Sequence, residues 1–181
     1  MEQHLSFNQS EAQSPDGSRR KWPNVPNLYG WLHLDRRGNW SINDLAVKHR
    51  RMISFLHNNY CKADSGDWYV QNGPQKAFVD LEYTPLVFRL EPDGRLITQT
   101  GIAISHPHSI VFDDEGNVLF ESSLGIGLLD DRDVYLAADW IDESIEQVTS
   151  ISWWGDTLAV KRILKPDVPK VYGFNPHPKQ P

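Results

Sequence analysis

Residues 64–90 read DSGDWYVQNGPQKAFVDLEYTPLVFRL, and this stretch decides the fold. Two runs rich in aromatic and β-branched residues, 68–70 and 76–83, flank the turn Asn72-Gly73-Pro74. Such residues fit a pleated sheet, while glycine and proline favour reversal of the chain. The pattern therefore predicts two neighbouring strands joined by a tight turn.

The second of these strands has one apolar face, because successive side chains of a strand point to opposite sides. The apolar face carries Ala77, Val79, Leu81 and Tyr83. The opposite face carries Phe78, Asp80 and Glu82. Pro85 lacks an amide proton and should end or bend the strand. We expect the apolar row to face the core.

Further hairpins are predicted downstream. Residues 86–98 surround Pro92-Asp93-Gly94, and residues 109–122 surround Glu115-Gly116-Asn117. Both turns have the residue types that chain reversals use, with apolar residues on either side. Residues 150–164 predict a last hairpin. Regular strand–turn–strand spacing without alternating helices favours an antiparallel sheet.

The segment between the later hairpins is less regular. Gly125-Ile126-Gly127 is a fragment of a glycine-rich loop, and we expect it to form a turn or bulge. Residues 130–142 predict a short helix or turn, with Leu129 or Asp130 as its cap. Its inward-facing residues should be Val134, Leu136 and Trp140.

One principal helix is predicted after the opening strand and turn of residues 28–40. Ser41 or Asn43 could accept a hydrogen bond from its first free amides, and Asn58-Asn59 could end it. A three-to-four spacing defines its apolar stripe, which comprises Leu45, Met52, Ile53 and Leu56. Trp31 and Trp40 are the expected core anchors beside it.

These elements predict a single α+β domain over residues 28–165, with a mostly antiparallel sheet and one helix packed on it. The full length of 181 residues fits one domain. Residues 1–27 have almost no periodic apolar residues, so we expect a disordered N-terminal tail. Five prolines and few apolar residues predict a second extended tail over residues 166–181.

Composition narrows the class of function. The formal net charge is −6, which argues against a nucleic-acid partner and against an anionic membrane surface. The apolar runs are far shorter than the roughly 20 residues of a spanning helix. Residues 1–18 lack the pattern of a secretory signal, and a single cysteine suits a reducing compartment. We therefore expect a soluble cytoplasmic protein.

The motifs of standard enzymes and metal sites are missing from the sequence. His106 and His108 could approach a metal, but no third and fourth ligands accompany them at suitable spacing, so we expect no metal and no cofactor. Residues 113–117 resemble part of a calcium loop without its ligand spacing, and a hairpin turn is the simpler interpretation. Cys61 has no identifiable catalytic partners and is expected to be a partly buried structural thiol.

The best candidate site is the pair Asp80 and Glu82, which share a strand face. Two carboxylates held together can raise the pKa of one of them, as acid–base catalysis requires. Arg89 or Lys76 could instead neutralise both in a surface network. The candidate binding residues are Asp80, Glu82, Arg89, Asn72 and Gln75. The two amides fit either a turn or a ligand contact.

The chain resembles an uncharacterised family of proteobacterial proteins. The shared elements are Gly30-Trp31, Asp64 with Gly66, Trp68 and Tyr69, then 72–75, 79–85 and 127–131. It is also similar to a second uncharacterised bacterial family, in which a Gly-x-Trp, a helix, an aromatic strand and a Val-Asp-acid-x-x-Pro element follow one another. Neither resemblance implies a known reaction or catalytic residues.

Two functions remain open on these grounds. The first is a non-enzymatic binding or interaction module with an unknown protein or small-molecule partner. The second is a small carboxylate-dependent hydrolase or isomerase that uses Asp80 and Glu82. Because no complete catalytic constellation is present in the sequence, the first is favoured.

Overall fold

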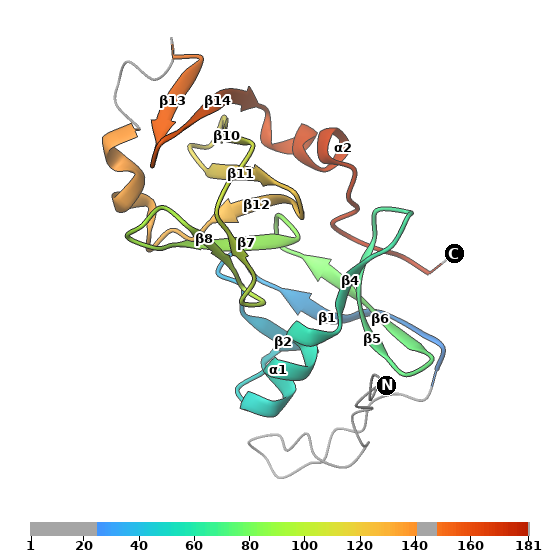
Figure 1. Ribbon diagram of the computed structural model, residues 1–181. Helices are drawn as coiled ribbons and strands as arrows, with labels where there is room; N and C mark the ends of the chain where they lie inside the picture. Colours follow the sequence, from blue (N-terminus) through green and yellow to red (C-terminus); the bar gives the residue numbers. More distant parts are fainter. Residues whose placement is uncertain (1–24, 141–147, 181) are drawn as a thin grey trace.

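The computed structural model describes residues 25–140 and 148–180, which form two sheets with short helices beside them (Figure 1). The first sheet has the order β3-β2-β1-β6-β5-β4. Its strands are β1 (Asn27–Leu34), β2 (Trp40–Ile42), β3 (Leu45–Ala46), β4 (Tyr60–Lys62), β5 (Trp68–Asn72) and β6 (Gln75–Leu81). The predicted hairpin of residues 64–83 is thus confirmed as β5 and β6.

The second sheet has eight strands in the order β13-β14-β10-β11-β12-β7-β8-β9. They are β7 (Leu86–Leu90), β8 (Leu96–Thr98), β9 (Ala103–Ile104), β10 (Ser109–Asp113), β11 (Val118–Ser122), β12 (Gly125–Leu129), β13 (Ser150–Trp153) and β14 (Asp156–Ile163). The predicted hairpins β7–β8, β10–β11 and β13–β14 are all present.

The chain crosses from the first sheet to the second at residues 82–85, inside the stretch quoted above. Tyr83 donates its hydroxyl proton to Asp113 over 2.6 Å. The Thr84 hydroxyl bonds Leu86 O over 2.7 Å and accepts from the Leu128 amide over 3.0 Å. On the side of the first sheet, the Glu82 amide donates to Leu34 O over 3.0 Å and the Tyr60 hydroxyl donates to Pro85 O over 2.9 Å. The crossing is therefore bonded to both sheets and locks them together.

The expectation of a single, mostly antiparallel sheet is corrected in the number of sheets, whereas most strand pairings are antiparallel as predicted. There are two sheets, and three of the twelve strand pairings in the described residues are parallel. The parallel neighbours are β1 with β6, β10 with β14, and β7 with β12. Parallel neighbours need long connections. Here each connection contains further strands, and the connection between β1 and β6 also contains α1. The sequence therefore lacks the regular alternation of strands and helices that would predict parallel pairing.

One five-residue turn recurs through both sheets. The first residue donates its amide to the fifth and accepts from the fourth, as in Asp35–Asn39 and Asp113–Asn117. The same two bonds close 63–67, 91–95 and 98–102. The fourth residue is glycine each time, with φ between 76° and 89°. Glycine adopts this left-handed conformation without steric strain, which accounts for the recurring G.

The principal helix begins later than predicted. Helix α1 spans Arg50–Asn58 and buries Met52, Phe55 and Leu56, whereas Ile53 is half-buried. Leu45 lies in β3 and is 44% exposed. Asn43 and Asp44 adopt positive φ and form the β2–β3 turn instead of a helix cap. The predicted stripe therefore joined residues of two different elements.

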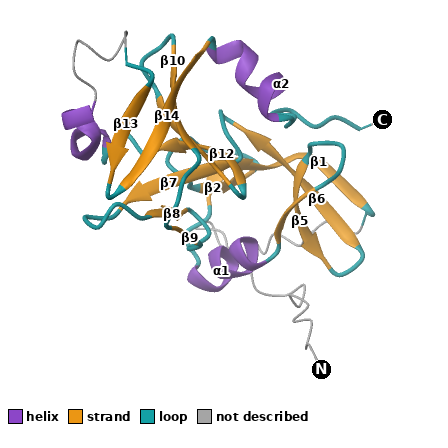
Figure 2. Ribbon diagram, turned by 45° about the horizontal axis from the view of Figure 1, so that its top comes forward, coloured by secondary structure: helices purple, strands orange, loops and turns teal. Residues whose placement is uncertain are grey.

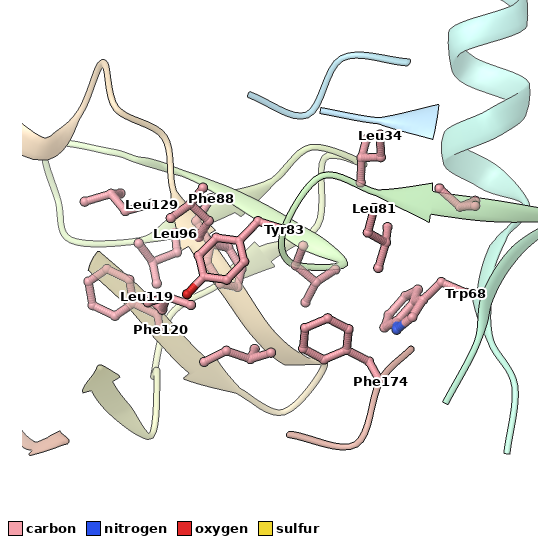
Figure 3. Close-up of a cluster of buried hydrophobic side chains, with 14 of the residues drawn as sticks. Leu34, Trp68, Leu81, Tyr83, Phe88, Leu96, Leu119, Phe120, Leu129 and Phe174 are labelled. Atoms are coloured by element: carbon pink, nitrogen blue, oxygen red, sulfur yellow. The ribbon is translucent and has the colours of Figure 1, made fainter. Parts of the chain in front are cut away.

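The core is one continuous cluster that extends across both sheets. In Figure 3, Tyr83 lies between a group with Leu81 and Phe174 and a group with Phe88 and Leu129. The predicted apolar row of β6 is buried, with Ala77, Val79 and Leu81 fully inaccessible. Trp40 is also buried, as expected, and Trp31 packs against the cluster from a partly exposed position.

The C-terminal segment packs on the domain, contrary to the predicted tail after residue 165. A 3-10 turn η3 (Lys165–Asp167) leads into α2 (Val168–Tyr172), and the chain then returns to the first sheet (Figure 2). Val168 and Phe174 are buried, and Pro176 O accepts the Leu81 amide over 2.8 Å. Proline suits the first turn of a helix, so a proline-rich sequence is compatible with this order.

Two further expectations concern residues 125–140 and the N-terminus. Gly125–Gly127 lies in strand β12 rather than in a turn, and a Cβ on Gly127 would lie 2.4 Å from the Phe88 ring. Residues Val134–Trp140 form the 3-10 helix η1, as the expected short helix, with Val134 and Leu136 against the core. The side chain of Trp140 and the predicted tail up to residue 24 lie outside the described residues.

Candidate functional site

The predicted site residues do not come together. Asp80 bonds the imidazole Nδ1 of His177, from the returning C-terminal segment. Arg89 forms a two-bond ion pair with Asp133, at 2.6 and 3.0 Å. Asn72 and Gln75 are buried in the β5–β6 hairpin, where the Gln75 amide donates to Val25 O over 2.9 Å. Only Glu82 lines the groove described below.

Three aspartates of residues 130–133 each bind a different arginine. Arg132 contacts Asp130, Arg37 contacts Asp131 and Arg89 contacts Asp133. Although burial opposes ionisation, hydrogen bonds from Arg132 lower the pKa of Asp130 to about 2. Burial likewise opposes the ionisation of Asp133, but bonds from Arg89 and the Leu90 amide lower its pKa. This acidic segment is therefore a set of fixed ion pairs.

A groove of about 580 Å³ lies between the turns Asp35–Asn39 and Asp113–Asn117. This volume falls within the roughly 300–1,000 Å³ of small-molecule sites. The groove is lined by Asp35, Arg36, Arg37, Glu82, Gly116, Asn117, Val118, Leu128, Leu129, Asp131 and Val134. Four apolar side chains thus lie beside a set of charged and amide groups.

The Asn117 side chain is held by a buried network below the groove. Asp113 accepts from the Asn117 side-chain amide at 2.7 Å and from the Tyr83 hydroxyl at 2.6 Å. Burial opposes the ionisation of Asp113, but the bonds from Tyr83 and Asn117 lower its pKa. Burial raises the pKa of Tyr83, and the bond to Asp113 raises it further. The network therefore pairs an ionised aspartate with a neutral tyrosine and fixes the direction of the Asn117 amide.

Arg36 is held in place by neutral groups. Its guanidinium Nη2 donates to Asn117 Oδ1, and its Cζ lies 5.4 Å from the centre of the Tyr83 ring. Within the described residues no carboxylate lies at ion-pair distance from this guanidinium. Four other arginines, Arg37, Arg89, Arg95 and Arg132, each pair with an aspartate. Arg36 is thus positioned without being neutralised.

Sequence reasoning missed Arg36, Asn117 and Asp113 as site residues. A signal was available in the repeated pattern D-x-x-G-N, which occurs at 35–39 and at 113–117. In both copies the first aspartate accepts from the amides of the third and fifth residues and from the side chain of the asparagine. The pattern marks both turns of the groove, although it does not say that they meet.

The other candidates of the sequence have structural partners. His106 Nδ1 lies 2.6 Å from Asp156 Oδ2, and the His108 amide donates to Glu121 O. Residues 113–117 form the predicted hairpin turn. Across 25–140 and 148–180 no group of three or more His, Cys, Asp or Glu is placed to hold a metal ion. Cys61 is half-buried as predicted, and burial raises the pKa of its thiol.

Comparisons with solved structures give two matches of low identity. A DUF1285 family protein from Silicibacter pomeroyi DSS-3 is 13% identical, with a TM-score of 0.51, over 82% of this chain and 95% of that one. A DUF1285 family protein from Shewanella baltica OS155 is 15% identical, with a TM-score of 0.46, over 62% and 94%. The first likeness concerns the fold alone.

Curated proteins give no significant match to the sequence. None of the helices in the described residues is long and apolar enough to cross a membrane. The predicted resemblance to a family without a known reaction is confirmed over residues 16–179. The chain belongs to the family DUF2944, whose description reads "Protein of unknown function (DUF2946)".

Proposed function

We propose that the protein is a non-enzymatic binding module, and that its ligand site is the groove between the turns Asp35–Asn39 and Asp113–Asn117. The observation that carries this proposal is Arg36, which neutral partners orient at a groove of ligand size. An arginine fixed in this way can form ion-paired hydrogen bonds with a ligand without first breaking an internal ion pair.

The arrangement of carboxylates favours binding over the carboxylate-dependent hydrolase or isomerase. Glu82 lines the groove, whereas Asp80 bonds His177 and is not among the lining residues. Arg89, which was expected to lie beside Asp80 and Glu82, forms an ion pair with Asp133 instead. An acid–base pair needs two groups that converge on one reacting atom. Asp80, Asn72 and Gln75 are therefore assigned to structural contacts in this proposal, and Glu82 is kept as a ligand residue.

The test is a screen of small polar molecules by two-dimensional amide NMR on the full chain. We expect ligands that bind to shift signals of residues 35–37, 82, 116–118 and 128–131. Val134→Trp should fill the groove and abolish these shifts. Val171→Trp is the matched control, because Val171 is 62% exposed on α2 and does not line the groove.

Two outcomes would contradict the proposal. The first is a set of ligands whose shifts map away from the groove, for example around Asp80 or Asn72. The second is binding that Val134→Trp leaves unchanged while its spectrum shows a native fold. If Val134→Trp does not fold, the map obtained with the unmodified protein still decides the location.

A further inference from the structure

Some charged groups of the groove have partners within the protein, and others do not. Three carboxylates and two guanidinium groups line it, which leaves one formal negative charge. Arg37 and Asp131 neutralise each other through two bonds of 2.7 and 2.9 Å. The Asp35 carboxylate accepts two backbone amides and the Asn39 side chain of its own turn. Arg36 and Glu82 are the two charges that remain for a ligand.

Glu82 and Asn117 bind different parts of Arg36. Glu82 Oε2 accepts the main-chain amide of Arg36 over 3.1 Å, and the guanidinium at the far end bonds Asn117. In the described part of the chain neither charge has an ion-pair partner, and the two do not pair with each other. The groove therefore has a positive and a negative group that do not neutralise each other.

Besides Gly116 and Asn117, the rest of the lining consists of four apolar residues. Val118, Leu128 and Leu129 are buried and belong to β11 and β12, whereas Val134 begins η1. Val118, Leu128 and Leu129 are at most 4% exposed, so the apolar surface that a ligand could remove from water is that of the partly exposed Val134. Covering it with a hydrocarbon or aromatic group is favourable by about 25 cal/mol per Å².

We propose that the groove binds a free α-amino acid with an apolar side chain. This inference rests on the proposed function. The ligand carboxylate pairs with the Arg36 guanidinium, the ligand ammonium pairs with Glu82, and the side chain covers the partly exposed Val134. A planar carboxylate matches the two parallel donors of a guanidinium, and an ammonium is a compact donor that suits one carboxylate.

The charge of the groove favours a free amino acid over other classes of small ligand. A zwitterion adds no net charge to a groove that already has one formal negative charge, whereas a phosphate ester would add up to two more. A simple monocarboxylate would engage Arg36 and leave Glu82 unpaired beside its own negative charge. A neutral apolar molecule would use neither. The volume also leaves room for the largest apolar side chains, so aromatic and aliphatic amino acids are both appropriate probes.

The experiment removes one charge at a time from ligand and protein. L-Leucine, L-phenylalanine and L-tryptophan are titrated into the full chain by calorimetry and amide NMR. The best of the three is then compared with its N-acetyl derivative, which lacks the ammonium, and its amide, which lacks the carboxylate. The variants are Arg36→Ala and Glu82→Gln, with Arg95→Ala and Glu91→Gln as controls from the equivalent turn 91–95.

We expect each loss of charge to weaken binding to the unmodified protein by about tenfold or more, as loss of a charge-assisted hydrogen bond does. Arg36→Ala should bind the amide derivative and the free amino acid with equal affinity. Glu82→Gln should bind the N-acetyl derivative and the free amino acid with equal affinity. The two control variants should bind like the unmodified protein. Glu82→Gln keeps an oxygen that can accept the Arg36 amide, so its fold should be intact.

The inference is overturned if the N-acetyl derivative binds as tightly as the free amino acid, because Glu82 then plays no part. It is also overturned if none of the three amino acids shifts groove signals while other ligands of the screen do. That second result leaves the proposed function standing. Groove signals that respond to no molecule in either experiment contradict the proposed function itself.

Discussion

The two D-x-x-G-N turns share a backbone and differ in what their side chains do. Asp35–Asn39 and Asp113–Asn117 have the same pair of main-chain bonds, the same hydrogen bonds to the carboxylate of the first aspartate, and a left-handed glycine. The first turn has Arg-Arg at its second and third positions, and the second has Asp-Glu. Conformation and contacts are thus specified by different residues of one motif.

The variable positions give each turn its neighbours. Arg36 reaches Asn117 and Arg37 reaches Asp131, so the first turn forms one wall of the groove. In the second turn, Asp114 accepts the Lys165 amide at 2.7 Å and Glu115 binds its ammonium at 2.6 Å. The second turn therefore anchors the start of the C-terminal segment. A repeated turn lets two positions vary freely because the other three maintain its shape.

The largest difference between the turns should appear when each first aspartate is removed. Asp113 is buried and also accepts the Tyr83 hydroxyl, whereas Asp35 serves only its own turn. Asp113→Ala should therefore lower the free energy of unfolding by about 3 kcal/mol, and Asp35→Ala by about 1 kcal/mol. Urea unfolding measures both. Equal losses would mean that the Tyr83 bond contributes nothing.

The second-largest difference between the turns should appear when their glycines are replaced by alanine. Gly38 and Gly116 have φ of 76° and 79°, so alanine strains both by about 1 kcal/mol. A Cβ on Gly38 would also lie 2.6 Å from the Cβ of Gln99, whereas nothing lies within 4 Å of one on Gly116. We expect Gly38→Ala to cost about 2 kcal/mol, near twice the loss in Gly116→Ala. Thermal unfolding of the two variants tests this, and a larger loss in Gly116→Ala would reverse the ranking.

What the sequence predicted correctly is largely what neighbouring residues decide. The β5–β6, β7–β8 and β10–β11 hairpins follow from turn residues that act over four or five positions. The parallel pairing of β1 with β6 and the packing of Phe174 depend on residues far apart in the chain, and no local pattern encodes them. The predicted start of α1 was wrong because Leu45 fits the apolar stripe of a helix as well as it fits a strand.

The site shows the same limit. Glu82 was selected because its spacing from Asp80 places both carboxylates on one strand face, and it lines the proposed groove. Arg36 and Asn117 are 81 residues apart, and their contact follows only from the way the two sheets are joined at 82–85. Arg89 was assigned to the wrong partner, because Asp133 approaches it from a segment with no recognisable periodicity.

The loss of stability at acidic pH should depend in part on Asp113. Its pKa is lower in the folded protein than in the unfolded chain, because bonds from Tyr83 and Asn117 outweigh the opposing effect of burial. Its stabilising contribution is therefore complete above the unfolded value of about 3.9 and is lost as the pH falls through the folded value. The stability difference between the unmodified protein and Asp113→Asn should shrink over this range. A difference that stays constant in urea titrations from pH 6 to acid would contradict the ionised assignment.

The smallest effect is expected at the second turn's contact with Lys165. The Lys165 ammonium lies 2.6 Å from Glu115 and 5.4 Å from the centre of the Tyr83 ring, which Arg36 approaches at the same distance. The Glu115 side chain is 55% exposed, and exposed ion pairs contribute about 0–1 kcal/mol. Lys165→Ala should therefore lower the free energy of unfolding by at most about 1 kcal/mol, and added salt should reduce this difference because exposed charges are screened.

Because the Lys165 main-chain amide still reaches Asp114, the C-terminal segment should keep its place. Thermal unfolding at low and high salt measures the effect, and a larger loss that salt leaves unchanged would mean that Lys165 acts through its packing on Tyr83. Arg36→Ala is the matched comparison, since it removes the other cation beside Tyr83 and belongs to the groove instead of the anchor.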